Sequence, residues 1–242
     1  METYRIALAG NPNTGKSTLF NTLTGSRQHT GNWPGKTVLQ AKGNYRHEGA
    51  LFELIDLPGT YSLFSNTADE QVARDYIIFD KPDVTVVVVD AMALQRNMNL
   101  ALQVLEMTEK AILCINLIDE AEKEGIRIDH KKMERMLGVP VVKISARNKI
   151  GIDSLKDTIL RFARGKVATR SYQVQYSEEI ETKIAELIPE VERQFGSLFP
   201  SRWLALRLID GDTKLLDDLE IKLEQGKREV DKDESGYHSR TS

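Results

Sequence analysis

The sequence lacks the residues that several protein classes require. A single cysteine, Cys114, and four histidines among 242 residues provide neither an internal disulfide nor the ligand spacing of a zinc site. Positive charge is not in excess either, because 33 Lys and Arg stand against 36 Asp and Glu, a net charge of −3. A chain without a global basic field is not drawn as a whole to nucleic acid, although a local basic patch would escape this argument.

Long apolar runs are also missing. The longest β-rich run, Val84 to Val89, is stopped by Asp90, whereas a bilayer-spanning helix needs about 18 apolar residues or more. The N-terminal Met1 to Arg5 lacks the basic and apolar regions of a signal peptide. The 40% hydrophobic and 29% charged residues are typical of a globular protein with a sizeable core. We therefore expect a soluble chain in a reducing compartment.

Short β-branched runs alternate with helical periodicity through the first two-thirds of the chain. This pattern predicts an α/β fold with a mostly parallel, six-stranded sheet flanked by helices. The expected strands are Arg5–Ala9, Val38–Tyr45, Leu51–Asp56, Val84–Asp90, Ala111–Asn116 and Val141–Ile144. The expected helices are Lys16–Thr24, Val72–Phe79, Asn97–Glu109, Asp129–Leu137 and Ile152–Arg164.

The strand patterns also predict positions within the sheet. Val84–Val89, Ala111–Ile115 and Val141–Ile144 are nearly continuous apolar runs, which is typical of strands buried on both faces, so we place them at the sheet centre. Val38–Tyr45 and Leu51–Ile55 are close enough to pair as an antiparallel hairpin.

After about residue 165 only helical patterns follow. We expect a first domain at residues 1–168, a small all-α domain at 169–225 and a disordered tail at 226–242. The helices expected in the second domain are Ser177–Phe195, Trp203–Ile209 and Thr213–Leu223. Residues 170–242 hold 11 basic and 16 acidic residues, a net charge of −5 without a basic stripe, which argues against nucleic acid as a partner.

One motif predicts phosphate binding. The segment from Gly10 to Ser17 fits G-x-x-x-x-G-K-[ST] and lies between an expected strand and an expected helix. Its glycines let backbone N–H groups face phosphate oxygens, Lys16 adds a charge near the β- and γ-phosphates, and Ser17 offers a hydroxyl to Mg²⁺. The residues expected to bind nucleotide here are Gly10, Asn11, Asn13, Thr14, Gly15, Lys16, Ser17 and Thr18.

Three further motifs each end an expected strand. Asp56-Leu57-Pro58-Gly59 places a carboxylate beside the phosphate loop. Asn116-Leu117-Ile118-Asp119 places a carboxylate that can accept from the N1–H and the 2-amino group of guanine, donors that adenine lacks. In Ser145-Ala146-Arg147, the Ala146 N–H is placed to reach the guanine O6. Taken alone, each motif is more typical of a turn or a helix cap, but their order favours a guanine-nucleotide site.

With these motifs, the chain resembles the translation-factor-related small GTPases and, more narrowly, the cytosolic N-terminal part of the FeoB family of bacterial ferrous-iron transporters. The resemblance covers roughly residues 4–224. It rests on these strings: Asn32-Trp33-Pro34-Gly35-Lys36-Thr37-Val38, Asp56 to Leu63, Asp69-Glu70, Ala73-Arg74-Asp75-Tyr76, and Arg202 to Leu208. It implies a P-loop GTPase domain followed by a helical domain of the dissociation-inhibitor type.

The resemblance also implies roles for single residues. Thr37 is expected to coordinate Mg²⁺ together with Ser17 and, through water, Asp56. Asn13 is expected to ligate K⁺, although an asparagine in a turn is also favoured for its tolerance of left-handed φ. Without the resemblance, Thr37 is simply a residue that begins a strand. The expected catalytic residues are Lys16, Asn13, Thr37 and Gly59.

Two positions depart from most GTPases. Leu117 stands where a lysine usually covers the base, and Thr60 stands where Ras-type enzymes place the glutamine that orients water. No arginine finger is identifiable, so we expect slow, K⁺-activated hydrolysis of GTP to GDP and phosphate.

The resemblance further implies a place and partners. It implies a cytoplasmic domain of a bacterial inner-membrane protein that regulates or drives ferrous iron uptake. Its partners would be a C-terminal transmembrane iron-permease domain absent from this chain, small Feo accessory proteins and further copies of itself. Two alternatives stay open: a ribosome- or tRNA-associated GTPase of the Era or MnmE kind, and a nucleotide-sensing module that does not hydrolyse GTP.

Overall fold

The chain forms two compact units. The computed structural model describes residues 1–25, 28–64, 67–212, 215 and 219. Contacts divide the chain into Met1–Val174 and Gln175–Ser242. Each unit has its own hydrophobic core.

The boundary lies six residues beyond the one expected after residue 168, because residues 169–174 are bonded to the first unit. The Thr169 hydroxyl donates to the Glu109 carbonyl at 3.1 Å. The backbone N–H groups of Arg170 and Tyr172 donate to the carbonyls of Gly138 and Leu137 at 3.1 and 2.8 Å. Residues 169–174 therefore complete the first unit.

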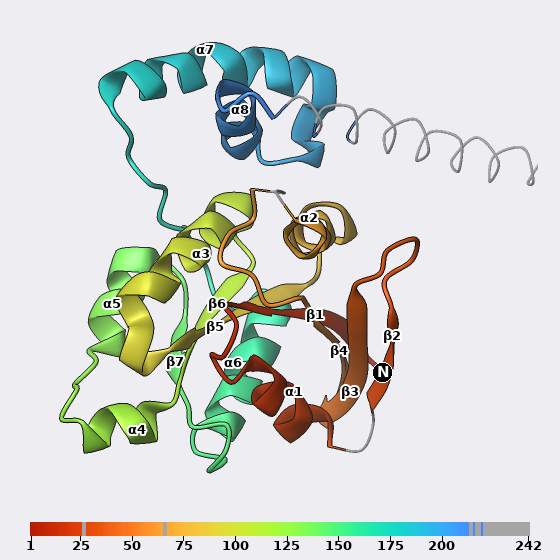
Figure 1. The fold of residues 1–242 in the computed structure, drawn as a ribbon, viewed down its shortest axis with the longest axis vertical. Coiled ribbons are helices and arrows are strands. Elements are labelled where there is room, and N and C mark those ends of the chain that lie inside the picture. The colour runs from red at the N-terminus through yellow and green to blue at the C-terminus, as the bar shows by residue number, and fades with distance from the viewer. Residues whose placement is uncertain (26–27, 65–66, 213–214, 216–218, 220–242) are drawn as a thin grey trace, which may run out of the picture. The chain divides into compact units, whose positions relative to one another are not determined.

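The first unit is built on a mixed sheet. Its strands are β1 (Thr3–Gly10), β2 (Gln28–Asn32), β3 (Leu39–His47), β4 (Ala50–Asp56), β5 (Val84–Asp90), β6 (Ala111–Asn116) and β7 (Val141–Lys143). Their order is β2-β3-β4-β1-β5-β6-β7 (Figure 1). The strands from β4 to β7 in this order are parallel, whereas β3 is antiparallel to β4 and β2 to β3.

The sheet thus has seven strands among the described residues, and the expectation of six is wrong. The additional strand is β2, whose sequence Gln-His-Thr-Gly-Asn has no apolar alternation. It lies at the sheet edge and pairs only with β3. Its strand conformation therefore results from hydrogen bonding to β3 and not from a buried apolar face.

The predicted hairpin is confirmed. Strands β3 and β4 pair antiparallel, with His47 opposite Ala50. The turn residues Glu48 and Gly49 have φ values of 46° and 78°, and two left-handed residues are the requirement of a type I′ turn. This turn matches the twist of the strands on either side of it.

The placement of Val141–Ile144 at the sheet centre is wrong, because β7 is the last strand of the sheet. Its apolar sequence is nevertheless explained by burial: Val141 and Val142 are 4% and 8% exposed. Helical cover over both faces of an edge strand favours the same residues as a central position.

Helices cover both faces of the sheet (Figure 1). From α1, Leu19 and Phe20 share a core with Val86 and Val88 of β5 and with residues of α6. Because side chains alternate along a strand, Val87 and Val89 face the other side, where α3 packs. The helices of this unit are α1 (Lys16–Thr24), α2 (Ala68–Asp75), α3 (Leu94–Met107), α4 (Ile118–Lys123), α5 (His130–Leu137) and α6 (Ile152–Ala163).

Helix α2 begins four residues before the expected Val72 and passes into a π-helical turn, Tyr76–Asp80. Its start is a capping box: the Thr67 hydroxyl accepts from the Glu70 N–H at 3.2 Å, and the Glu70 carboxylate accepts from the Thr67 N–H at 3.2 Å. The short helix α4 was not expected. It has only six residues, too few for helical periodicity to be read.

In the second unit, α7 (Glu178–Phe195) and α8 (Ser201–Ile209) pack together. Ile184, Ala205 and Leu206 form their buried core. Of the expected helix Thr213–Leu223, only Leu215 and Leu219 fall within the described residues, and the tail 226–242 lies outside them. None of the described helices combines the length and the apolar character needed to cross a membrane.

An ion pair joins the start of α7 to α8. The guanidinium of Arg202 donates to both carboxylate oxygens of Glu181 at 2.7 and 2.8 Å, and the Tyr176 N–H donates to the same carboxylate at 2.9 Å. The Tyr176 ring lies 6.0 Å from the guanidinium carbon. These donors, Arg202 first, lower the pKa of Glu181 to about 2.

This pair makes the stability of the second unit depend on pH. A carboxyl whose pKa is lower in the folded state contributes its full stabilisation above its unfolded pKa and loses it as the pH falls. We expect Glu181→Gln to lower the urea midpoint at pH 7, and the difference from wild type to shrink as the pH falls from about 4.5 toward 2. Trp203 fluorescence in a Trp33→Phe background measures this transition.

Glu179→Gln is the matched control. Glu179 lies in the same helical turn and pairs with Lys183 at 2.7 Å, but its side chain is 79% exposed. Exposed pairs of this kind contribute little. Equal effects of the two substitutions at pH 7 would contradict the role given to Glu181.

Candidate nucleotide-binding site

The phosphate loop connects β1 to α1, as expected. Gly15 has a φ of 76° and Asn13 a φ of 66°, so the loop contains two left-handed residues. The Thr14 hydroxyl donates to the Asn11 carbonyl at 2.9 Å and closes the turn. No side chain caps the start of α1, so its first backbone N–H groups are available to bind an anion.

Lys16 is held by the segment that follows β4. Its ammonium group is 8% exposed, forms an ion pair with the Asp56 carboxylate and donates to the Leu57 carbonyl at 2.6 Å. The Ser17 hydroxyl donates to the second oxygen of Asp56 at 3.3 Å. The parallel pairing of Leu8 with Asp56 places this carboxylate beside the loop.

The donor set fits a divalent cation. A hydroxyl and a carboxylate oxygen stand next to each other at Ser17 and Asp56, and Mg²⁺ prefers oxygen ligands of this type. Thr37, the third expected ligand, is exposed, and within the described residues no hydrogen bond joins it to Ser17 or Asp56. Thr18 is exposed on the first turn of α1.

Residues Gly31–Thr37, which include the expected Mg²⁺ ligand Thr37, form the end of a hairpin. Gly31 and Asn32 belong to β2, and the Trp33 N–H donates to the Val38 carbonyl at 2.8 Å. The Trp33 ring packs edge-on against Tyr76 with 5.4 Å between ring centroids.

A second contact joins this hairpin to the end of α2. The Lys36 ammonium lies 3.8 Å from the Asp75 carboxylate. The hairpin is thus attached to the elements that follow the Asp56 motif.

The Asp56 motif itself lies against the phosphate loop. The N–H of Leu57 donates to the Leu8 carbonyl at 3.0 Å, and that of Thr60 to the Gly10 carbonyl at 3.4 Å. Gly59 is exposed, and a Cβ placed on it would lie 3.4 Å from Pro12. Thr60 is 5% exposed, so its side chain belongs to the core and does not orient water.

The Asn116 side chain connects two loops. Its Nδ2 donates to the Thr14 carbonyl at 2.9 Å, and its Oδ1 accepts from the Ala146 N–H at 2.9 Å. Asn116 is 1% exposed, and its amide lies where a Cβ on Gly15 would stand. The Ala146 N–H, expected to reach the guanine O6, is therefore already engaged.

Asp119 presents an open acceptor. Its Oδ2 accepts from the Asn148 amide at 2.7 Å, whereas its Oδ1 is buried and accepts no well-formed hydrogen bond in the described part of the chain, although the Ser145 hydroxyl lies close enough to act on the carboxylate. The pKa of Asp119 is lowered, first by the Ser145 hydroxyl, so the carboxylate stays ionised at neutral pH. Arg147 is exposed beside this site.

One residue and one backbone conformation at this end of the site escaped the sequence analysis. Asn148 belongs to none of the sequence motifs. Its amide acquires a role only because α4 places Asp119 within hydrogen-bond distance of it. Leu117 was identified, but its backbone was not: it has a φ of 63°, uncommon for a residue with a branched side chain. It precedes α4 and aims Asp119 from the first helical turn.

Comparison with known proteins assigns both units. The family model described as Ferrous iron transport protein B matches residues 4–159, and the model of the FeoB cytosolic helical domain matches residues 176–240. The Fe(2+) transporter FeoB of Escherichia coli K12 is 39% identical over 216 residues, which are 88% of this chain and 27% of the transporter. The chain thus spans about a quarter of the curated relatives it matches.

Solved structures agree. The cytosolic domain of the Thermotoga maritima FeoB iron transporter in apo form has a TM-score of 0.83 and 37% identity, and the match covers 92% of this chain and 86% of that one. The same domain was also solved in GDP and GMPPNP forms. The FeoB G-domain of Methanococcus jannaschii has a TM-score of 0.61 and 48% identity, over 68% of this chain and 99% of that one.

The Lys16–Asp56 pair predicts how nucleotide affinity depends on Mg²⁺. Without Mg²⁺, the Asp56 carboxylate competes with phosphate for Lys16 and repels it. Asp56→Asn should therefore raise GDP affinity in EDTA several-fold and abolish the gain in affinity on adding Mg²⁺. Titration with a fluorescent GDP analogue measures both.

Asp153→Asn provides the control, because this carboxylate is 90% exposed on α6. It should leave GDP binding unchanged. Weaker GDP binding by Asp56→Asn in EDTA would contradict the proposed competition.

Proposed function

This chain belongs to the ferrous iron transport protein B family, and we propose that its first unit binds and hydrolyses GTP as the cytosolic, nucleotide-dependent part of a ferrous-iron transporter. The observation that carries the proposal is the unpaired acceptor of Asp119, a residue that follows β6 at the same edge of the parallel strands where the phosphate loop follows β1. A P-loop alone would serve many nucleotides, whereas this carboxylate selects the base.

Guanine selectivity follows from an unpaired buried acceptor. Guanine offers two donors, N1–H and the 2-amino group, to one carboxylate. Adenine offers neither, so an adenine nucleotide would leave the Asp119 Oδ1 buried without a partner. The Asn148 amide holds the other oxygen and fixes the plane of the carboxylate. Relatives solved in GDP and GMPPNP forms support the same base.

The phosphate end of the site supplies positive charge. The Lys16 ammonium and the N–H groups at the start of α1 bind the phosphates, and Ser17, Asp56 and Thr37 are the residues that would hold Mg²⁺. Mg²⁺ when bound neutralises charge on the β- and γ-phosphates. To bind phosphate, Lys16 exchanges its contact with Asp56 for phosphate oxygens.

Hydrolysis needs positive charge between the β- and γ-phosphates in addition to that of Lys16, and no other described side chain of the motifs supplies it. No arginine is placed by a motif, and Thr60 is buried, so intrinsic turnover is slow. We assign the missing charge to K⁺, with Asn13 as its side-chain ligand. Asn13 is exposed in the phosphate loop and adopts a left-handed φ of 66°, which asparagine tolerates well. Its role in the turn is therefore compatible with a role as a K⁺ ligand.

The remaining K⁺ ligands would come from backbone carbonyls of the Gly31–Thr37 segment. In this structure Gly31 and Asn32 are paired with β3, so closure over the phosphates requires that the end of the hairpin leave the sheet edge. K⁺ activation and switch closure are therefore one event in this proposal.

The proposal places the chain at the cytoplasmic side of the bacterial inner membrane. The chain covers only 26–28% of its curated relatives, so iron permeation belongs to a transmembrane domain outside this sequence. Accessory Feo proteins and further copies of the chain are its proposed partners. A relative from Porphyromonas gingivalis is described as a fusion of Fe(2+) transport protein A with FeoB, which supports the accessory partner.

Asp119→Asn tests the base assignment. An amide can accept only one of the two guanine donors, so GDP affinity should fall at least tenfold, about 1.4 kcal/mol or more, and xanthine nucleotides should bind better than in wild type. Competition titrations with GDP, XDP and ADP measure this. Glu120→Gln, an exposed neighbour in α4, should change nothing. Equal competition by ADP and GDP in wild type would refute the assignment.

A comparison of K⁺ with Na⁺ tests the hydrolysis. Replacing Na⁺ by K⁺ at constant ionic strength should raise phosphate release several-fold or more. Asn13→Ala should lose this response and keep most of its GTP affinity, because Lys16 and the backbone still hold the phosphates. No phosphate release in either salt would instead favour a nucleotide sensor without hydrolysis. A K⁺ response that survives in Asn13→Ala would assign the charge to another group.

A further inference from the structure

The free edge of the sheet at β7 is an unused hydrogen-bonding surface. Strand β7 pairs only with β6, and the Pro140 carbonyl and the Ile144 N–H both bond toward β6, at 2.9 and 2.8 Å. Because alternate residues of a strand face opposite edges, the N–H and C=O of Val141 and the N–H of Lys143 face outward. These groups have no hydrogen-bond partner within the described ranges.

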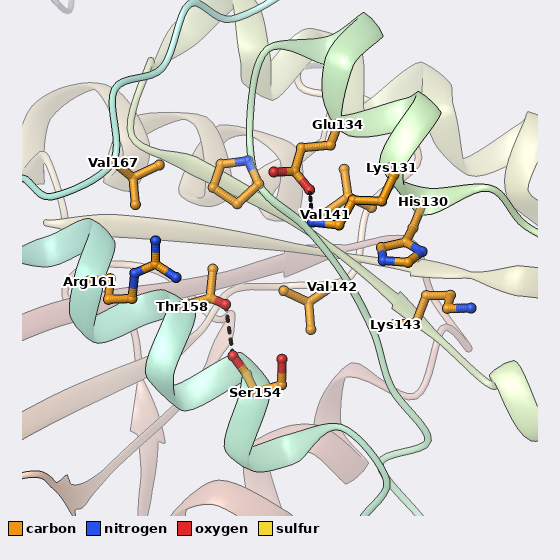
Figure 2. Close-up of a pocket in the computed structure, with 11 residues that line it drawn as sticks. His130, Lys131, Glu134, Val141, Val142, Lys143, Ser154, Thr158, Arg161 and Val167 are labelled. Carbon is orange, nitrogen blue, oxygen red and sulfur yellow. Dashed lines mark hydrogen bonds and ion pairs between the residues drawn. The ribbon is translucent and has the colours of Figure 1, made fainter.

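A cavity of about 450 Å³ lies along this edge. Figure 2 shows it between α5, which contributes His130, Lys131 and Glu134, and α6, which contributes Ser154, Thr158 and Arg161. Val141 and Val142 of β7 also line it, and because neighbouring side chains of a strand point to opposite faces, they lie on different sides of this edge. A volume of this size is typical of a ligand site.

The cavity is basic. Glu134 is its one acidic lining residue, and it is already paired with Lys131 at 3.0 Å. Lys143 and Arg161 form no ion pair in the part of the chain that the structure describes. The cavity therefore offers two uncompensated positive charges beside a row of free backbone groups.

We infer that the β7 edge binds an extended, acidic segment of a partner protein, which adds to the sheet as a further strand. Main-chain bonds to Val141 and Lys143 would supply affinity, and carboxylates of the segment would meet the charges of Lys143 and Arg161. Pairing of β7 with a second copy of itself would bring two such basic cavities together, and like charges disfavour that occupant. The inference is independent of nucleotide binding.

Edge protection is the competing explanation. Natural sheets often end in a short strand that carries a lysine, which blocks unwanted pairing. Under that explanation Lys143 repels every strand, whatever its charge. The two explanations differ in what happens with an acidic strand.

The test uses the full chain and fluorescent peptides of eight residues in which valine alternates with glutamate. We expect binding by fluorescence anisotropy at 0.15 M salt, and slower hydrogen exchange of the Val141 and Lys143 amides when the peptide is bound. A peptide of the same charge with N-methyl groups on alternate residues should bind at least tenfold more weakly, because it cannot complete the ladder. A peptide with lysine in place of glutamate should not bind.

Two variants locate the site. Lys143→Glu should weaken peptide binding at least tenfold, whereas Lys132→Glu, an exposed lysine of α5 outside the cavity, should not. Val141→Pro removes an outward N–H without breaking a bond to β6, so it should also weaken binding while the chain remains folded.

Three outcomes would overturn the inference. Equal binding of the N-methylated peptide would show charge attraction without strand addition. No binding of the acidic peptide, with wild-type folding intact, would leave edge protection as the role of Lys143. Light scattering that shows a dimer lost in Lys143→Glu would assign the edge to a second copy of the chain.

Discussion

The nucleotide site depends on one buried side-chain amide. Asn116 ends β6, donates to the phosphate loop at Thr14 and accepts from the loop that follows β7 at Ala146. Three segments that are far apart in the sequence thus share a single residue that is almost completely buried. Gly15 is required in part because the amide occupies the space where its side chain would be. The phosphate end and the base end of the site are consequently held in a fixed position relative to each other.

The charges of the site compensate one another in this structure. Lys16 is the only cation in the phosphate loop, and Asp56 and the Leu57 carbonyl occupy it. A buried ammonium without such partners would be costly. The Asp56 segment therefore compensates the charge of Lys16, and in the proposed function it releases this lysine when phosphate binds.

The sequence predicted the fold class and the family because motif residues determine their own local structure. The glycines of the phosphate loop, the Glu48–Gly49 turn and the buried strands β1, β5 and β6 follow from rules that involve few neighbours. The strand β2 did not, because its polar residues become a strand only through pairing with β3. The edge position of β7 depends on the order of strands, and the role of Asn148 depends on where α4 lies. The roles of Thr37 and Asn13 stay predictions, since they require the hairpin to move.

The packing of Trp33 on Tyr76 sets an energetic threshold for that movement. An aromatic pair of this geometry is worth about 0.5–1.5 kcal/mol beyond the area it buries. A ligand shifts such an equilibrium only by the difference in its affinity for the two states. In the proposed closure, part of the free energy of the γ-phosphate contacts would therefore be consumed in releasing the tryptophan, and a nucleotide without that phosphate would leave the hairpin in the sheet. In the proposed closure, discrimination between the two nucleotides would then originate in part at this ring pair, outside the contacts to phosphate.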